Sequence, residues 1–269
     1  MSIIAEFSHN HLGDLNLLKD MVFAAANAGA KYCKIQTHFA ADLTPDWKGQ
    51  AERVKKYELD WDAHAQFVAW CRRAKVIPMT SVYTFRYAEK LNQVGFRHIK
   101  IGSAQAGDDD MVRRYLLLGF KVVLSTGGHA IKDIPRLGPL EAVLHCVSQY
   151  PTHPHKANLC RMHDLMVKFP NCQVGFSDHT HYTNQNHVAK TAILLGADIT
   201  EKHFTLKAHD ATKDGPVSVD PTSLADLCKF EKKSIEERLA ESEAYGLFRY
   251  PQGEDEIKLI KEHKTKWQA

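Results

Sequence analysis

The sequence contains no apolar run that approaches the length of a membrane span, and no strand-like segment leads into a glycine-rich nucleotide fingerprint. Residues 1–6 lack the basic region and the long apolar core of a secretory signal peptide. The formal net charge is only +3 and is dispersed, which argues against nucleic acid but allows a basic pocket for a small anion. We therefore expect a protein that acts on small molecules, with neither nucleic acid nor membrane as a partner.

Cysteine is present, but the spacing typical of cysteine-based metal or redox motifs is not. No two of the cysteines form a CxxC pair. The six residues are Cys33, Cys71, Cys146, Cys160, Cys172 and Cys228. We interpret them as reduced, buried, small apolar side chains, which is typical of a cytoplasmic protein.

The chain has 269 residues, of which 44% are hydrophobic and 25% charged, as in ordinary globular proteins. This length fits one large α/β barrel or two small domains. One local pattern recurs: a helical apolar stripe, a glycine, and a short apolar run that ends in a polar residue. The glycines are Gly29, Gly95, Gly119 and Gly196. A glycine just after a helix tolerates the left-handed conformation that redirects the chain into the next strand.

Eight strand-like runs alternate with helical stretches. They cover residues 3–5, 32–36, 77–80, 98–101, 121–125, 142–144, 173–176 and 198–201. This alternation predicts an α/β protein, a single-domain (β/α)8 TIM barrel over residues 1–243 with a C-terminal tail or helix at 244–269. An open doubly wound sheet is the structural alternative, and the missing fingerprint disfavours it.

The ends of several helices are also readable. Asp14 is expected to cap a helix over residues 15–28, and Asp220 with Pro221 to begin a helix that runs towards Leu239. Three residues, Pro135, Gly138 and Pro139, interrupt the fifth unit, so a full helix is not expected there.

Two histidines follow neighbouring strand-like runs, with a helix-like stretch over residues 183–195 between them. His179 lies just past the run 173–176, and His203 just past the run 198–201. Carboxyl ends of parallel strands meet at one end of a barrel. The two imidazoles are therefore expected within reach of one metal ion.

Other polar side chains end the remaining strands. The whole set is Glu6, Lys34, Gln36, Ser81, Lys100, Ser103, Ser125, Ser148, Tyr150, Ser177, His179, Glu201 and His203. Serines with two lysines can hold a phosphate and a carboxylate, and two neutral imidazoles suit a divalent transition ion acting as a Lewis acid. Each residue alone also fits a structural hydroxyl, a solvated charge or a packed histidine. Their coincidence at one end of the barrel indicates an active site for an anionic ligand and a metal.

Several segments resemble motifs of the sialic acid synthases (N-acetylneuraminate synthases), in order from Ile3 to Leu227. They are residues 3–6 with Asn10-His11 and Gly13-Asp14, 34–37, 100–103, 124–127, 144–146 with 150–152, Asn158-Leu159, 175–180 and 201–205. The resemblance implies a barrel that condenses phosphoenolpyruvate with an open-chain amino-sugar aldehyde, typically N-acetylmannosamine. The products would be a nine-carbon 2-keto-3-deoxy acid and phosphate. Members of the family are usually homodimers.

The resemblance also implies roles by motif position. His179 and His203 would bind a divalent metal, Mn²⁺ first, with Mg²⁺ or Co²⁺ as alternatives. The phosphoenolpyruvate site would comprise Lys34, Ser81, Lys100, Ser103, Ser125, Ser148 and Ser177, and the catalytic residues would be Glu6, Lys34 and Lys100. Gln36, Gln105 and Tyr150 would face the acceptor sugar. We expect Glu6 to act as a general base or to position water, and Asp178 to support the metal ligands rather than bind the ion.

Four departures from the family concern the sugar side. Gln105 stands where the family usually has a glutamate, and residues 215–218 contract the segment that carries a sugar-binding aspartate, unless Asp210 or Asp214 replaces it. About three extra residues lie around 181–186. The family's antifreeze-like C-terminal domain is not expected in this chain. These differences predict a related acceptor, which could be a differently substituted or anionic sugar.

Other functions remain open from the sequence. A catalytically inactive barrel could bind a sugar or phosphate as a partner subunit. A metal-dependent hydrolase could use the His9-Asn10-His11 pair, and a Schiff-base aldolase could use Lys34 or Lys100. Residues 244–269 could also reach a neighbouring subunit's site, for example through Arg249.

Overall fold

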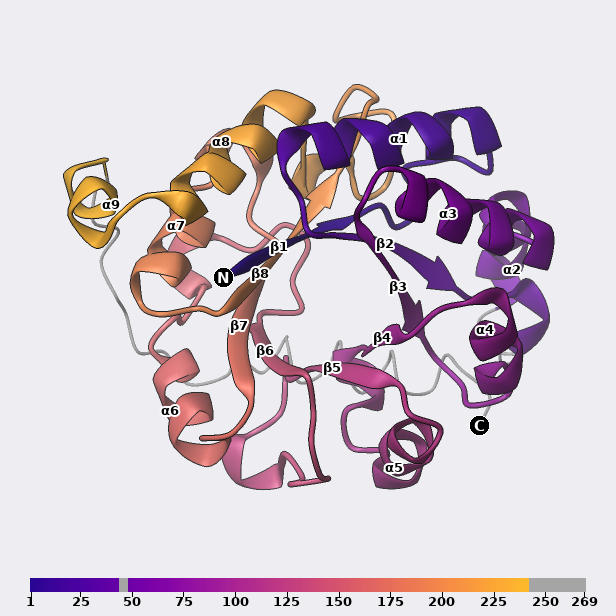
Figure 1. The fold of residues 1–269 in the computed structure, drawn as a ribbon, viewed down its shortest axis with the longest axis horizontal. Helices are drawn as coiled ribbons and strands as arrows, with labels where there is room; N and C mark the ends of the chain where they lie inside the picture. The colour runs from indigo at the N-terminus through magenta and orange to yellow at the C-terminus, as the bar shows by residue number, and fades with distance from the viewer. Residues whose placement is uncertain (44–47, 242–269) are drawn as a thin grey trace.

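A computed structural model describes residues 1–43 and 48–241, and its strands close into a parallel barrel (Figure 1). The strands are β1 Ser2–Glu6, β2 Tyr32–Thr37, β3 Ile77–Val82, β4 His98–Ile101, β5 Lys121–Ser125, β6 Ala142–Cys146, β7 Gln173–Asp178 and β8 Ile199–Phe204. Each pairs in parallel with the next, and β1 also pairs with β8. The predicted (β/α)8 barrel is confirmed. A short extra strand, β9 Ser218–Val219, pairs with β8 and was not predicted.

The helices form an outer ring around the strands (Figure 1). They are α1 Leu15–Ala28, α2 Lys48–Tyr57, α3 Trp61–Arg73, α4 Ala88–Val94, α5 Asp109–Leu117, α6 Arg161–Lys168, α7 His187–Leu194, α8 Pro221–Lys232 and α9 Ile235–Glu241. Between β5 and β6 the helical content is one 3₁₀ turn, η4 Ile131–Asp133, which confirms the predicted degenerate fifth unit. Over residues 1–43 and 48–241, no helix has the length and apolarity needed to cross a membrane.

The predicted helix starts are confirmed, and two helix extents are wrong. Asp14 accepts hydrogen bonds from the backbone N–H groups of Asn16 and Leu17, and Asp220 accepts one from Ser223. However, the helix after Asp220 ends at Lys232 instead of running towards Leu239. A new helix starts there because Ser234 and Glu237 form a reciprocal capping box, with hydrogen bonds of 3.2 and 2.8 Å.

The helix predicted over residues 183–195 is also shorter than expected. Residues Tyr182–Asn184 form a 3₁₀ turn, η6, and α7 starts only at His187. Gln185 and Asn186 between them have φ angles of 49° and 63°. A right-handed helix cannot pass through left-handed residues, so the stretch splits into two elements.

The core has two parts on the two faces of the barrel wall. A small inner cluster fills the barrel. Its residues occupy the first to third positions of the strands and are Ile4, Tyr32, Met79, Val123, Ala142, Leu144 and Ile199. A much larger outer cluster lies between the strands and the helices. Because side chains alternate along a strand, Ile199 of β8 faces the interior and Phe204 faces the helices. This inner apolar cluster lies below the carboxyl ends of the strands, where the polar side chains are found.

Cysteine burial follows the prediction for four of the six residues. Cys33, Cys71, Cys146 and Cys228 are buried, whereas Cys160 and Cys172 are partly exposed. Cys160 precedes α6 and Cys172 precedes β7, so both lie in surface connections instead of the core.

Close packing between β7 and β8 provides a test of the fold. A Cβ atom on Gly175 would lie 1.9 Å from the backbone oxygen of its strand neighbour Ile199. Gly175→Ala should therefore lower the free energy of unfolding by about 1–3 kcal/mol or more, measured by chemical denaturation. The control is Gly102→Ala, whose Cβ would lie an ordinary 3.6 Å from Gln105 and which should unfold like the wild type. Equal stability of the two variants would contradict this packing.

Candidate active site

Strand register brings the predicted polar residues together at one end of the barrel. Glu6 at the end of β1 is level with Lys34 of β2 and with His203 of β8. On the next strand pair around the barrel, Ser177 of β7 is level with Glu201 of β8. Since all eight strands are parallel, their carboxyl ends open on the same mouth.

Two lysines and two carboxylates form a charge-compensated network at this mouth. Lys34 makes ion pairs with Glu6 and, at 3.5 Å, with Glu201, and it donates a 2.7 Å hydrogen bond to Ser81. Lys100 pairs with the other oxygen of Glu201. Ser177 donates a 2.8 Å bond to Glu201 and lies 3.5 Å from the Lys100 ammonium. We call Glu6, Lys34, Lys100 and Glu201 the lysine–carboxylate network.

The network is buried, and its electrostatics depend on mutual pairing. All four of its side chains are at most 9% exposed. Burial alone would raise the pKa of Glu201, but Lys100 and Lys34 lower it well below the usual range. Burial alone would lower the pKa of Lys34, but Glu201 and Glu6 raise it. Both groups therefore stay charged at neutral pH.

The two predicted metal histidines lie side by side beside the network. Their ring centroids are 5.7 Å apart at an interplanar angle of 66°. The Nδ1 atom of His179 lies 2.8 Å from the Val147 carbonyl, so Nδ1 carries the proton and Nε2 accepts a 2.9 Å hydrogen bond from the Tyr150 hydroxyl. Burial and the neighbouring His203 lower the pKa of His179 to about 3. Burial also lowers the pKa of His203, although Asp214 opposes this shift.

This pair fits a divalent transition ion. Both imidazoles are neutral at pH 7, and the Nδ1 atom of His203 is buried without a hydrogen-bond partner in the part of the chain that the structure describes. Neutral imidazoles are the preferred ligands of such ions. Within residues 1–43 and 48–241, no group of three or more His, Cys, Asp or Glu side chains is arranged to enclose a metal.

A cradle of hydroxyls surrounds Gly127, which follows β5. A Cβ atom at this position would lie 2.5 Å from the Ser148 hydroxyl and 3.0 Å from that of Ser103. The Gly127 N–H donates a 2.9 Å bond to Ser103. Nearby, the Ser125 hydroxyl at the end of β5 is buried without a hydrogen-bond partner among residues 1–43 and 48–241. Three hydroxyl groups therefore gather at Gly127, where no side chain fits, and hydroxyl groups suit a small oxyanion.

The three residues predicted to face the acceptor sugar have different surroundings. Gln36 donates hydrogen bonds of 3.2 and 3.1 Å to Glu6 and Ser8, so it belongs to the mouth. Tyr150 stacks on His179 with ring centroids 4.1 Å apart, and it is 49% exposed at the rim. Gln105 is buried on the turn after β4, and no described residue makes a hydrogen bond with its Oε1 atom.

Of the two aspartates proposed to replace the missing one, Asp214 lies at the site. It accepts a hydrogen bond from Ser8, and its carboxylate interacts with His203. The His203 imidazole and the Ser8 hydroxyl hold the pKa of Asp214 below its usual value despite burial. Asp210 is exposed.

Some residues of the site received no role from the sequence. Glu201 carries both lysine contacts, yet it was noted only as a strand-end carboxylate. The signal was available, because Glu201 and His203 are two residues apart on one strand and so face the same side. Ser8, Tyr83 and Gly127 gave no comparable signal. Burial raises the pKa of Tyr83, with Glu6 and Asp214 as contributing neighbours, so its hydroxyl is part of this mouth.

The HxH pair that suggested a hydrolase does not join these ligands. His9 contacts His38, with 2.8 Å between their Nε2 atoms. His11 accepts a 3.1 Å hydrogen bond from the Gly13 N–H, and burial lowers its pKa to about 3. His11 therefore stabilises the turn after β1, and the hydrolase alternative gains no support.

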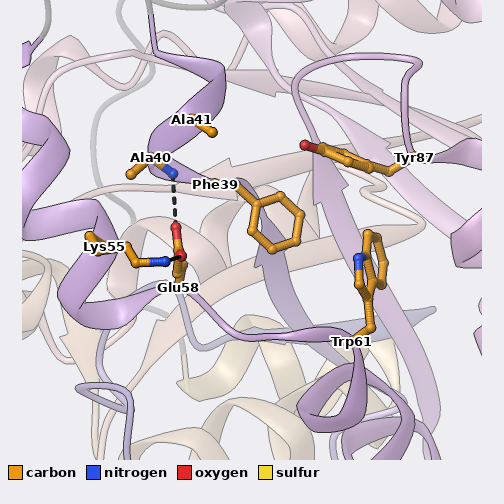
Figure 2. Close-up of a pocket in the computed structure, with 7 residues that line it drawn as sticks. All are labelled: Phe39, Ala40, Ala41, Lys55, Glu58, Trp61 and Tyr87. Atoms are coloured by element: carbon orange, nitrogen blue, oxygen red, sulfur yellow. Dashed lines mark hydrogen bonds and ion pairs between the residues drawn. The ribbon is translucent and has the colours of Figure 1, made fainter.

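A separate pocket of about 340 Å³ lies beside the segment that follows β2 (Figure 2). It is lined by Phe39, Ala40, Ala41, Lys55, Glu58, Trp61 and Tyr87. None of these was a predicted site residue. The Phe39 ring packs 5.4 Å from that of Trp61, and Glu58 accepts a 2.9 Å hydrogen bond from the Ala40 N–H. These contacts fix the segment to α2 and α3.

Comparison with known proteins gives a consistent result. The sequence model of the NeuB family matches residues 21–243. The N,N'-diacetyllegionaminic acid synthase of Campylobacter jejuni is 30% identical over 256 residues, which cover 84% of this chain and 74% of that protein. The N-acetylneuraminate-9-phosphate synthase of Drosophila melanogaster is 30% identical over 246 residues, covering 84% and 65%.

A solved structure extends the similarity to three dimensions. The N-acetylneuraminic acid synthetase of Leptospira borgpetersenii, in complex with citrate, superposes with a TM-score of 0.81 at 25% identity. The superposition covers 98% of this chain and 91% of that one.

Removing one member of the lysine–carboxylate network tests its role. Glu201→Gln leaves Lys100 without a carboxylate partner in the described structure, and losing one partner of a buried pair costs about 3–5 kcal/mol of stability. Inorganic phosphate should then raise the melting temperature of this variant more than that of the wild type, because the anion restores the missing charge.

The matched control is Glu141→Gln, which breaks the exposed pair between Lys121 and Glu141 at 3.8 Å. Exposed pairs contribute about 0–1 kcal/mol, so this variant should respond to phosphate like the wild type. The same response from both variants would contradict the assigned network.

Proposed function

The chain belongs to the NeuB family, and from this premise we propose that it condenses phosphoenolpyruvate with the open-chain aldehyde of an amino sugar. The products are a 2-keto-3-deoxy sugar acid of the sialic acid type and inorganic phosphate. The observation that carries this proposal is the lysine–carboxylate network beside the pair His179 and His203. Fold alone would not support it, since barrels of this type host many reactions.

Phosphoenolpyruvate has a carboxylate and a phosphate, and the mouth offers a group for each. Lys34 with Ser81 suits the carboxylate. Lys100 with Ser177, together with the hydroxyls around Gly127, suits the larger phosphate. Because Glu6 and Glu201 already occupy the lysines, the ligand must exchange with or rearrange these carboxylates.

We propose that His179 and His203 bind the metal, with Mn²⁺ as the ion and Mg²⁺ or Co²⁺ as alternatives. When bound, such an ion supplies Lewis-acid polarisation of the aldehyde oxygen. The chain's part is to keep both imidazoles neutral by burial and to orient His179 through the Val147 carbonyl. Tyr150, whose hydroxyl contacts His179, would then have to exchange this contact for the acceptor.

The reaction requires one carbon–carbon bond, one water and one carbon–oxygen cleavage. Carbon 3 of phosphoenolpyruvate attacks the aldehyde carbon, which leaves carbon 2 cation-like, and water adds there with loss of a proton. Glu6 is placed to take this proton once the substrate has displaced it from Lys34, because Gln36 and the Ser8 N–H still hold its carboxylate at the mouth. The tetrahedral intermediate then expels phosphate as its carbon-2 hydroxyl loses its proton and becomes the keto group. The two protons released from water end on the new carbon-4 oxygen and on phosphate, whose charge Lys100 stabilises.

The acceptor occupies the side of the mouth formed by Gln36, Ser8, Asp214 and Tyr150. We propose that Asp214 replaces the aspartate lost by the contraction at residues 215–218 and binds an acceptor hydroxyl. Gln105 replaces an acidic group, so the pocket carries less negative charge than expected for the family. The relatives differ in the products for which they are named, which include N,N'-diacetyllegionaminic acid and N-acetylneuraminate 9-phosphate. The acceptor is therefore a related amino sugar, neutral or anionic, and not fixed as N-acetylmannosamine.

The other functions are not favoured by any specific observation. Both lysines are engaged in ion pairs, and the carboxylates Glu201 and Glu6 raise the pKa of Lys34, whereas a Schiff-base lysine must be neutral to attack a carbonyl. An inactive barrel would have no use for two buried, neutral histidines beside a charged network. The C-terminal residues 244–269, including Arg249, and the boundary at Glu243 lie outside the described residues, and dimer formation stays a prediction.

The test is phosphate release from phosphoenolpyruvate with Mn²⁺ and a panel of acceptors. The panel contains N-acetylmannosamine, its 6-phosphate, other N-acetylated hexosamines and unsubstituted aldoses. Release should depend on an amino-sugar acceptor and stop on metal removal by a chelator. If none of these acceptors supports phosphate release, the condensation proposal is wrong. If only N-acetylmannosamine supports it, the proposal of an altered acceptor is wrong.

Two variants of one loop test the acceptor side. Asp214→Asn should raise the acceptor KM by about 10-fold or more, as expected for a lost charge-assisted hydrogen bond, and leave the phosphoenolpyruvate KM unchanged. Asp210→Asn is the control, because Asp210 is exposed and should behave as the wild type. Equal effects of the two changes would contradict the placement of Asp214.

A further inference from the structure

A second buried ion pair lies behind the two histidines, outside the lysine–carboxylate network. The Lys202 ammonium is 3.0 Å from the Asp178 carboxylate, and the two side chains are 1% and 0% exposed. Asp178 immediately precedes His179, and Lys202 immediately precedes His203. The two charged residues are also level with each other across β7 and β8.

The pair lies on the opposite face of the barrel wall from the mouth. Side chains alternate along a strand, so Asp178 shares its face with Phe176, and Lys202 shares its face with Phe204. Both phenylalanines belong to the outer hydrophobic cluster between strands and helices. Charges in such an apolar layer are costly to bury, and replacing a buried pair by apolar groups often leaves stability unchanged or increased. Stability is therefore a weak reason for this pair.

The pair holds the backbone of the residue that follows His179. Lys202 donates a 2.9 Å hydrogen bond to the Thr180 carbonyl, and Asp178 accepts a 2.8 Å bond from the Thr180 N–H. The His179 carbonyl itself accepts a 2.8 Å bond from the Thr152 N–H. The residue before His203 is thus tied to the residues on either side of His179.

We propose that Asp178 and Lys202 are positioning residues that set the separation and orientation of the His179 and His203 imidazoles. They touch neither substrate nor metal, and they act by fixing the two backbone segments that carry the ligands. Supporting contacts of this kind change metal affinity when they are removed, because the ligands lose their common geometry. The inference rests on the proposed metal site at these histidines.

The test compares Mn²⁺ affinity, measured by electron paramagnetic resonance of the free ion, with thermal stability. The double variant Asp178→Leu with Lys202→Met removes both charges at similar volume. We expect Mn²⁺ affinity weakened about 10- to 100-fold in a protein that still folds, with a melting temperature below that of the wild type because the Thr180 N–H and carbonyl lose their side-chain partners. Binding of phosphoenolpyruvate in the presence of a chelator should be unchanged, because Lys34 and Lys100 are untouched.

Thr200→Val is the control on the same strand face. Its hydroxyl is buried and has no hydrogen-bond partner among the described residues, and it lies two residues before Lys202 on β8. This variant should bind Mn²⁺ like the wild type. A double variant that also binds Mn²⁺ like the wild type overturns the inference and leaves the proposed function standing.

Asp178→Asn is the conservative variant, and it tests the inference if the double variant fails to fold. Asparagine keeps an acceptor for the Thr180 N–H but loses the charge opposite Lys202. Mn²⁺ affinity should fall, by less than in the double variant, and unchanged affinity overturns the inference. Wild-type protein that binds no Mn²⁺ overturns both the inference and the metal part of the proposed function.

Discussion

The structure depends on the pairing of two buried lysines with two buried carboxylates at the mouth of the barrel. Glu6, Lys34, Lys100 and Glu201 are nearly inaccessible, and an isolated charge at any of these places would be strongly destabilising. They are tolerated because every lysine faces a carboxylate. The pairing crosses several strands, from β1 and β8 to β2 and β4, so it requires the closed barrel. The open doubly wound sheet would have separated β1 from β8 and broken the network.

The same constraint connects the fold to the chemistry. An inner apolar cluster closes the floor beneath the charges, which lowers the local dielectric and strengthens each electrostatic contact above it. A ligand with several negative charges can enter such a mouth only by exchanging partners with carboxylates already present. On this account Glu6 and Glu201 hold the lysines in place before the substrate binds. Neutral His179 and His203 at the edge of the network add the position for a metal.

Much of this architecture was readable from the sequence because it depends on local patterns. Apolar runs that alternate with helical stripes gave all eight strands, and residues after them gave the serines, the lysines and the histidine pair. Helix extents were less accessible. The capping box at Ser234 and Glu237 competes with a continuing helix, and the left-handed Gln185 and Asn186 depend on local backbone geometry.

The remaining parts depend on contacts between distant segments, which a single sequence does not display. Nothing near Asp214 distinguishes it from Asp210 until the loop folds back onto Ser8. The double role of Glu201 follows from the meeting of β2, β4 and β8, and the cradle at Gly127 follows from the approach of Ser103 and Ser148. Charge compensation across a barrel is a property of its closure, so it becomes visible only in three dimensions.

The measurement that tests the central claim most directly is calorimetric titration of phosphoenolpyruvate into the wild type, Lys34→Met and Lys100→Met, with Lys121→Met as an exposed control. The account predicts saturable one-site binding to the wild type and the control, and loss of that binding in both network variants. Both network variants must first be shown to be folded. Binding that persists unchanged in folded Lys34→Met and Lys100→Met protein would contradict the claim that this network is the substrate site.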